Sequence, residues 1–177
     1  MNKIKRLGVG LFFTLIPFSA MSFDIGLKYG VNLIDFDGDG IEDIVIKSRR
    51  ALNSTTTVDM VTVYIKGNDD RTYIVPSIYA NASSLYDSYI KDTNIKISDF
   101  KFIEKKGYVI LLSLEKIGNN LLNPAPIRFS SYRIAEQKNN NEELYRWKFS
   151  SHCVTEVDYL SVDEAFSDSC FNKIINE

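Results

Sequence analysis

Apolar and β-branched residues occur along this chain in short runs that polar turn residues separate. These runs predict β-strands over residues 25–34, 43–47, 58–65, 71–75, 96–103, 108–114, 126–135 and 143–149. The segment Glu104-Lys105-Lys106-Gly107 has the composition of a tight turn between two of them. Many short strands joined by such turns are typical of a mainly β domain. We therefore predict a mainly β (α+β) fold, a single-domain antiparallel sheet or sandwich.

The period of the pattern changes near the C-terminus, where helical spacing replaces alternation. The apolar residues that fall near one helical face are Val162, Ala165, Phe166, Cys170 and Ile174. Ser161 and Glu164 have the spacing of a capping box, in which Ser161 accepts from a first-turn amide and Glu164 bonds back to it. The pattern predicts one helix over 162–175. Residues 77–95, rich in Ser and Tyr, predict a short helix or a surface loop.

Residues 1–22 have the pattern of a secretory signal peptide. A basic start precedes an apolar segment over 7–20, and small residues follow it, so cleavage is expected before Phe23. The apolar segment is too short for a transmembrane anchor, and the alternative is a buried N-terminal helix. We expect one exported domain over 23–177, soluble and without membrane contact after cleavage.

The charge balance argues against a nucleic-acid partner. The chain carries 21 Lys and Arg residues and 23 Asp and Glu residues, a formal net charge of −2. Three of the basic residues and none of the acidic ones lie in the predicted signal peptide, so the mature chain carries a net charge of −5. Nucleic-acid binding requires clustered cations, which a mildly acidic surface does not favour.

Cys153 and Cys170 lie 17 positions apart in a chain that we expect to be exported. Cysteines in an oxidising compartment pair by default. A metal site would need closely spaced partners, and only His152 is near; a reactive thiol would need a base and a positive setting, and neither is evident. We expect a structural disulfide between Cys153 and Cys170 that ties the C-terminal helix to the last strand.

The acidic loop Asp-Phe-Asp-Gly-Asp-Gly-Ile-Glu-Asp, residues 35–43, lies between two predicted strands. Carboxylates at loop positions 1, 3, 5 and 9, with glycine at position 6, give the spacing that supplies oxygen ligands to Ca²⁺. The predicted ligands of a structural Ca²⁺ are Asp35, Asp37, Asp39, the backbone carbonyl of Ile41, and Asp43. Position 12 is Ile46 rather than Glu, which excludes an EF-hand. The loop resembles the calcium loop of FG-GAP repeats, and the alternative is an Asp- and Gly-rich turn without metal.

Motifs for catalysis are weak. Ser88-Tyr89-Ile90-Lys91 matches the Ser-x-x-Lys string of serine β-lactamases, but the companion motifs are absent. His152 is the only histidine, whereas zinc hydrolases use several. We therefore expect no enzyme. Trp147, between Arg146 and Lys148, is the best single candidate for an aromatic binding contact, although strand aromatics more often form core.

Five segments, taken in order, form a longer pattern. They are residues 29–45, 61–65, 73–76, 98–100 and 162–166. In this order they resemble the CarG-like family of periplasmic carbapenem self-resistance proteins. The resemblance implies a non-catalytic periplasmic protein that confers intrinsic resistance or immunity to carbapenem-type β-lactams. Its partner would be a β-lactam small molecule or the protein that the drug attacks. The alternative is a periplasmic or secreted protein-interaction module of the toxin-immunity or adhesion type.

Overall fold

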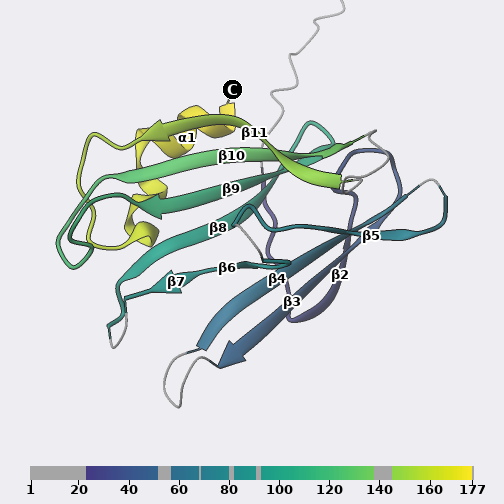
Figure 1. The fold of residues 1–177 in the computed structure, drawn as a ribbon. Helices are drawn as coiled ribbons and strands as arrows, with labels where there is room; N and C mark the ends of the chain where they lie inside the picture. Colours follow the sequence, from purple (N-terminus) through teal and green to yellow (C-terminus); the bar gives the residue numbers. More distant parts are fainter. Residues whose placement is uncertain are drawn as a thin grey trace, which may run out of the picture.

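Two antiparallel sheets and a C-terminal helical layer form the structure, as a computed structural model shows (Figure 1). The structure describes residues 23–51, 57–67, 69–79, 82–90, 93–137 and 145–176. The predicted signal peptide over 1–22 lies outside the described residues. Within these ranges, no helix is both long enough and apolar enough to span a bilayer. The predicted mainly β fold is confirmed.

The larger sheet has six strands in the order β1-β8-β9-β10-β11, with β7 paired to β8. Their bounds are β1 Phe23–Asp24, β7 Ser88–Tyr89, β8 Lys96–Lys105, β9 Tyr108–Lys116, β10 Ile127–Glu136 and β11 Tyr145–Val154. Lys106 and Gly107 join β8 to β9, both with positive φ, 53° and 80°. Positive φ at both central residues is the geometry of a tight type I′ hairpin, which explains the glycine there.

The smaller sheet has five strands in the order β2-β3-β4-β5, with β6 paired to β4. Their bounds are β2 Gly30–Ile34, β3 Asp43–Ala51, β4 Thr57–Lys66, β5 Thr72–Val75 and β6 Leu85–Tyr86. The described part of 77–95 contains no helix. It holds β6, which pairs with β4 of the smaller sheet, and β7, which pairs with β8 of the larger one. Leu85 of β6 is buried in the core between the sheets. This segment carries the chain from one sheet to the other.

An apolar core fills the space between the two sheets. Three aromatic rings lie at its centre, with ring centroids 5.0 Å apart for Phe36 and Phe102 and 6.1 Å apart for Phe36 and Trp147. Valines from the smaller sheet and Leu111 of β9 surround them. Trp147 is only 9% exposed. Trp147 is therefore a core residue, as strand aromatics more often are, and not the binding contact for which it was the best single candidate.

The opposite face of the larger sheet is also buried. Along β9, Val109 and Leu111 face the smaller sheet, whereas Ile110 and Leu112 pack with residues of the C-terminal helices. A strand buried on both faces reads as a continuous apolar run rather than an alternating one. The six-stranded sheet is thus the middle layer, with the smaller sheet on one side and the helices on the other (Figure 1).

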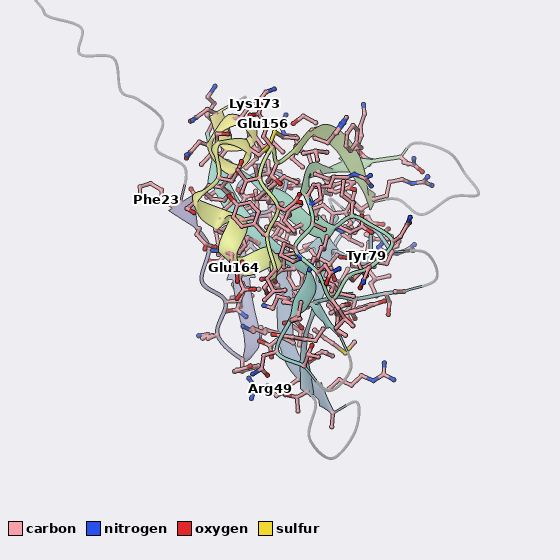
Figure 2. All side chains as sticks on the ribbon, turned by 90° about the vertical axis from the view of Figure 1, so that its left-hand side faces the viewer. Phe23, Arg49, Tyr79, Glu156, Glu164 and Lys173 are labelled. Carbon is pink, nitrogen blue, oxygen red and sulfur yellow. A yellow bond between two sulfur atoms is a disulfide. The ribbon has the colours of Figure 1, made fainter. Side chains whose placement is uncertain are left out.

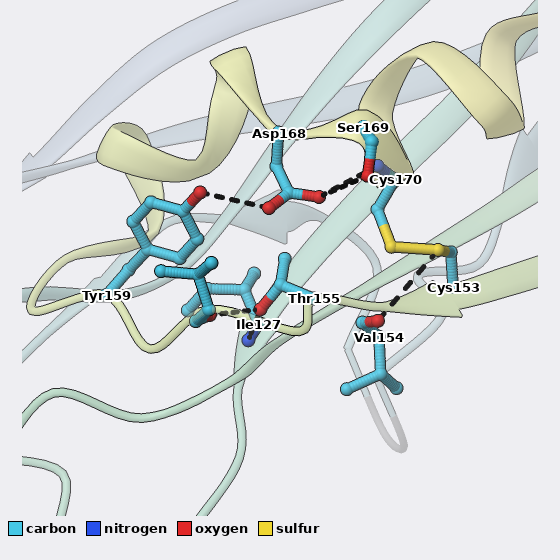
Figure 3. Close-up of a disulfide and its surroundings, with 9 residues drawn as sticks. Ile127, Cys153, Val154, Thr155, Tyr159, Asp168, Ser169 and Cys170 are labelled. Atoms are coloured by element: carbon cyan, nitrogen blue, oxygen red, sulfur yellow. Dashed lines mark hydrogen bonds between the residues drawn. A yellow bond between two sulfur atoms is a disulfide. The ribbon is translucent and has the colours of Figure 1, made fainter.

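The predicted helix over 162–175 is two shorter ones, the 3₁₀-helix η1 Val162–Ser167 and α1 Ser169–Asn176. Asp168 separates them in an extended conformation. Its carboxylate accepts hydrogen bonds from the Cys170 amide at 2.8 Å and from the Tyr159 hydroxyl at 2.9 Å (Figure 3). Asp168 thus caps α1 by satisfying a first-turn amide, and the break follows from this bond.

The predicted capping box is wrong. The Ser161 side chain makes no cap hydrogen bond; instead its hydroxyl accepts from the Lys96 amide at 3.1 Å and donates to Asp163. Glu164 accepts from the amide of Leu160 at 3.1 Å rather than from that of Ser161. Ser161 therefore joins the helical layer to β8, a contact with a strand 65 residues away in the sequence.

The disulfide between Cys153 and Cys170 is confirmed (Figure 3). It joins β11 to α1 across a Cα–Cα distance of 5.5 Å and closes a loop of 17 positions. The helical layer is therefore covalently held against the sheet that it covers.

We predict that replacing both cysteines by alanine lowers the free energy of unfolding. Closing a loop of this length stabilises a native state by about 3 kcal/mol in the chain-entropy model, because it restricts the unfolded chain. Urea denaturation, with and without a reductant, measures the effect. The reductant should lower the midpoint of the wild type and leave that of the Cys153→Ala/Cys170→Ala variant unchanged. Equal midpoints for oxidised wild type and variant would contradict the prediction.

Candidate functional site

The acidic loop connects β2 to β3, and its own carboxylates fold it. Asp35 accepts hydrogen bonds from the amides of Gly38 at 2.8 Å and Gly40 at 2.9 Å. Both glycines have φ of +85°, a conformation that favours glycine. Asp39 accepts from the Ile41 amide at 2.7 Å, and Asp37 accepts from the Asp39 amide. The loop is thus a series of tight turns that leaves other carboxylate lone pairs open.

Three carboxylates converge on one point of this loop. Asp35, Asp37 and Asp39 each offer an oxygen, and these oxygens lie within 4.8 Å of one another. Burial raises the pKa of Asp37 above its ordinary value, and repulsion from Asp39 and Asp35 adds to the rise. A cation among them would remove this repulsion, and clustered carboxylate oxygens are the donors that a hard cation such as Ca²⁺ takes. The donor set therefore fits the ion predicted from the sequence.

Asp43, the fourth predicted ligand, is placed differently. Its side chain is 1% exposed, and its two oxygens accept from the amides of Phe36 and Lys66, each at 2.9 Å. Burial raises its pKa to about 6, although both amide donors act in the opposite direction. Asp43 holds the start of the loop against the end of β4. The structure therefore groups Asp35, Asp37 and Asp39, with Ile41 following them, and uses both Asp43 oxygens to hold the backbone.

A second charged cluster, which the sequence pattern had not indicated, lies between the sheets. Lys96 contacts Asp99 at 3.0 Å and Asp87 at 3.4 Å, and Asp59 pairs with Lys47 at 3.1 Å. Burial raises the pKa of Asp99; burial opposes the charged form of Lys96, but its carboxylate partners outweigh this and raise its pKa. These residues line a cleft of about 300 Å³.

The alternation of inward and outward residues along β4 is the sequence signal that could have located this cluster. Asp59 continues the inward series Val61, Val63 and Ile65, so a charged residue occupies a core-facing position. Arg49 also contacts Asp59, and it lies at the end of the molecule opposite Lys173 (Figure 2). Asp87 accepts a hydrogen bond from the Asp59 amide of β4 at 3.1 Å and pairs with Lys96 of β8, so the cluster links the two sheets. Because each of these carboxylates already faces a cation, the cluster exerts little net attraction on a charged ligand.

Comparison with known proteins gives two matches. A family model described as "Carbapenem resistance protein CarG-like" matches residues 27–168. The crystal structure of CarG superposes with a TM-score of 0.76 at 23% sequence identity, covering 81% of this chain and 93% of that chain. At this identity the structural likeness shows a shared fold. A search of curated proteins found no match.

We predict that Asp43→Asn destabilises the protein by about 1–3 kcal/mol, because one buried amide, of Phe36 or Lys66, loses its acceptor. In the wild type, the raised pKa means that the Asp43 contribution to stability falls as the pH rises from about 4 to about 6. The variant should lose this pH dependence. Thermal melts in a chelator at several pH values measure both effects.

The matched control is Glu42→Gln, which removes a charge from the exposed neighbour of Asp43. This variant should melt like the wild type. If the two variants melt alike, the hydrogen bonds of Asp43 do not hold the loop.

Proposed function

The chain belongs to the CarG-like family of carbapenem resistance proteins, and we propose that it protects a cell against carbapenem-type β-lactams without hydrolysing them. The observation that carries this proposal is the family match over residues 27–168. A non-hydrolytic role is supported by the sequence, because one histidine cannot supply the several zinc ligands of a metallo-hydrolase. Protection then means binding the drug or shielding the protein that it attacks.

We place this activity in the periplasm. The pattern of residues 1–22 supports export, and the disulfide between Cys153 and Cys170 supports an oxidising compartment. Carbapenems act on targets outside the inner membrane, so a protective protein must meet the drug there. The proposed location and the proposed role are therefore consistent.

We also propose that Asp35, Asp37 and Asp39 hold a structural Ca²⁺, with the carbonyl of Ile41 as a further ligand. The convergence of three carboxylates supports this, since their mutual repulsion would be relieved by the ion. Asp43 contributes by fixing the backbone from which these side chains project. The ion would supply charge neutralisation and rigidity, and no chemical step depends on it.

A second candidate function, a protein-interaction module, is favoured by the outward face of the smaller sheet. Leu33, Ile44, Tyr64 and Ile74 lie in one row across β2, β3, β4 and β5. Leu33 is 55% exposed and Val31, in the neighbouring row, is 54% exposed. The solvent face of an antiparallel sheet is usually polar, and an exposed apolar stripe marks an interaction surface.

We predict that expression of the full-length chain raises the carbapenem concentration that a susceptible Gram-negative host survives. A copy that lacks residues 1–22 should give no protection, because the drug and its targets lie outside the inner membrane. Drug remaining in the medium, measured by chromatography, should not fall faster than with an empty vector. Loss of drug would contradict the non-hydrolytic role.

Absence of protection at a periplasmic level verified by immunoblot would contradict the resistance role. The row formed by Leu33, Ile44, Tyr64 and Ile74 would then favour the interaction-module function. A charged substitution at the exposed Leu33 tests that function through loss of partner binding in a pull-down.

We predict that Ca²⁺ raises the melting temperature of the protein. At an ion concentration about tenfold above Kd, binding to the native state contributes about 1.4 kcal/mol. This corresponds to a rise of roughly 3–6 °C for a domain of this size. The variant Asp37→Asn/Asp39→Asn should abolish the rise, since its amide oxygens can still accept the loop hydrogen bonds but carry no charge.

Glu42→Gln is the matched control for charge removal in the same loop, and it should keep the full response to Ca²⁺. A wild type whose melting is indifferent to both Ca²⁺ and chelator would contradict the metal proposal.

A further inference from the structure

A depression of about 360 Å³ lies where the acidic loop meets the larger sheet. We call it the basic pocket. Its lining includes two cations, Arg133 and Lys148, one carboxylate, that of Asp37, and the aromatic rings of Tyr108 and Phe149. The Val109 amide donates to the carbonyl of Phe36 at 3.2 Å, so the acidic loop is fixed against β9 at this point. The acidic loop and β9 therefore form one rigid side of the basic pocket.

Two cations lie side by side at the rim of the basic pocket. Arg133 of β10 and Lys148 of β11 are direct cross-strand partners. Like charges placed opposite each other on neighbouring strands destabilise a sheet. Among the residues that the structure describes, neither cation forms an ion pair with a carboxylate. An anion bound between them would relieve this repulsion.

The guanidinium of Arg133 is oriented by an aromatic ring. Its Cζ lies 3.4 Å from the ring centroid of Tyr108, so the face of the guanidinium stacks on the ring. Stacking leaves the N–H groups in the guanidinium plane free to donate. A planar carboxylate is the group that accepts two such parallel bonds. The arrangement is suited to a carboxylate rather than to a spherical anion.

The apolar surface of the basic pocket comes from its aromatic walls. The rings of Tyr108 and of Phe149, which is 52% exposed, line the pocket, whereas the side chains of Phe36, Val109 and Ile134 belong to the core between the sheets. A small-molecule site typically combines apolar walls with a few convergent polar groups, and its volume is about 300–1,000 Å³. The basic pocket, at the lower end of this range, suits a compact ring system with one carboxylate. The cleft around Lys96 differs, because its cations already face carboxylates.

We propose that the basic pocket binds the carboxylate of a carbapenem, with Arg133 and Lys148 as its two cationic contacts. The choice of a carbapenem rests on the proposed function, whereas the choice of a carboxylate rests on the pocket. The fused rings of the drug lie against the exposed ring of Phe149, and the carboxylate lies against the rim. This assignment gives the proposed protection a specific binding site.

Calorimetric titration of the purified protein with meropenem, and with its methyl ester, tests the proposal. The wild type should bind the acid at least tenfold more tightly than the ester, because a charge-assisted hydrogen bond contributes a tenfold or larger factor. Arg133→Gln/Lys148→Gln should weaken binding of the acid at least tenfold and remove the preference for the acid. The matched control is Arg128→Gln, on the same strand and paired with Glu115; it should bind like the wild type.

Folding of the variants is checked by thermal melts. Arg133 and Lys148 are exposed, so the double variant should melt at the wild-type temperature or slightly above it, since a like-charge pair is removed. A variant that binds the acid as tightly as the wild type overturns the proposal, and so does a wild type that does not bind the acid. A variant that melts far below the wild type is replaced by Lys148→Gln alone, which should still weaken binding.

A cell-protection assay with the wild type and the double variant distinguishes failure of the pocket assignment from failure of the proposed protective function. Wild-type protection that the double variant retains overturns the pocket assignment and leaves the protective role intact. Acid-specific binding that the variant loses, together with no protection by the wild type, supports the pocket and overturns the protective role.

Discussion

The six-stranded sheet is apolar on both of its faces. The rest of the structure depends on this, because each face needs a separate layer to shield it from water. Leu111 and Leu112 are adjacent in β9, fully buried, and directed to opposite sides. Removing each such side chain from water contributes about 1.5–3 kcal/mol, so neither face can remain open. The smaller sheet covers one face and the η1–α1 layer the other. The disulfide and the bond from Ser161 to β8 hold the second covering, which is too short to be stable by itself.

Phe36 connects this core to both candidate sites. Its ring packs against Phe102 and Trp147, which fixes the backbone between Asp35 and Asp37. The carboxylates on either side of Phe36 therefore project from a rigid segment, and its carbonyl holds one side of the basic pocket through Val109. Asp37 borders that pocket as well as belonging to the carboxylate group. The acidic loop and the basic pocket are thus built around one buried aromatic residue.

Local patterns predicted those features that depend on nearby residues. Alternation located most strands, and Gly107 marked the turn between β8 and β9. The spacing of Asp35, Asp37 and Asp39 was enough to predict that their oxygens converge. Features set by distant contacts were missed: Ser161 bonds to β8 instead of capping a helix, and the partnership of Arg133 with Lys148 depends on the register of β10 and β11. Neither contact leaves a signal in a short window of sequence.

The C-terminal helices of the chain cover one face of the larger sheet, and this sets the order in which the chain can fold. Residues 162–176 supply the second covering, so an emerging chain has β8, β9 and β10 before it has anything to place over their outer face. Until those last residues arrive, Ile110, Leu112 and Phe129 remain in contact with water. The core under the C-terminal helices therefore closes last, and the unfinished chain exposes an apolar surface that a chaperone could recognise.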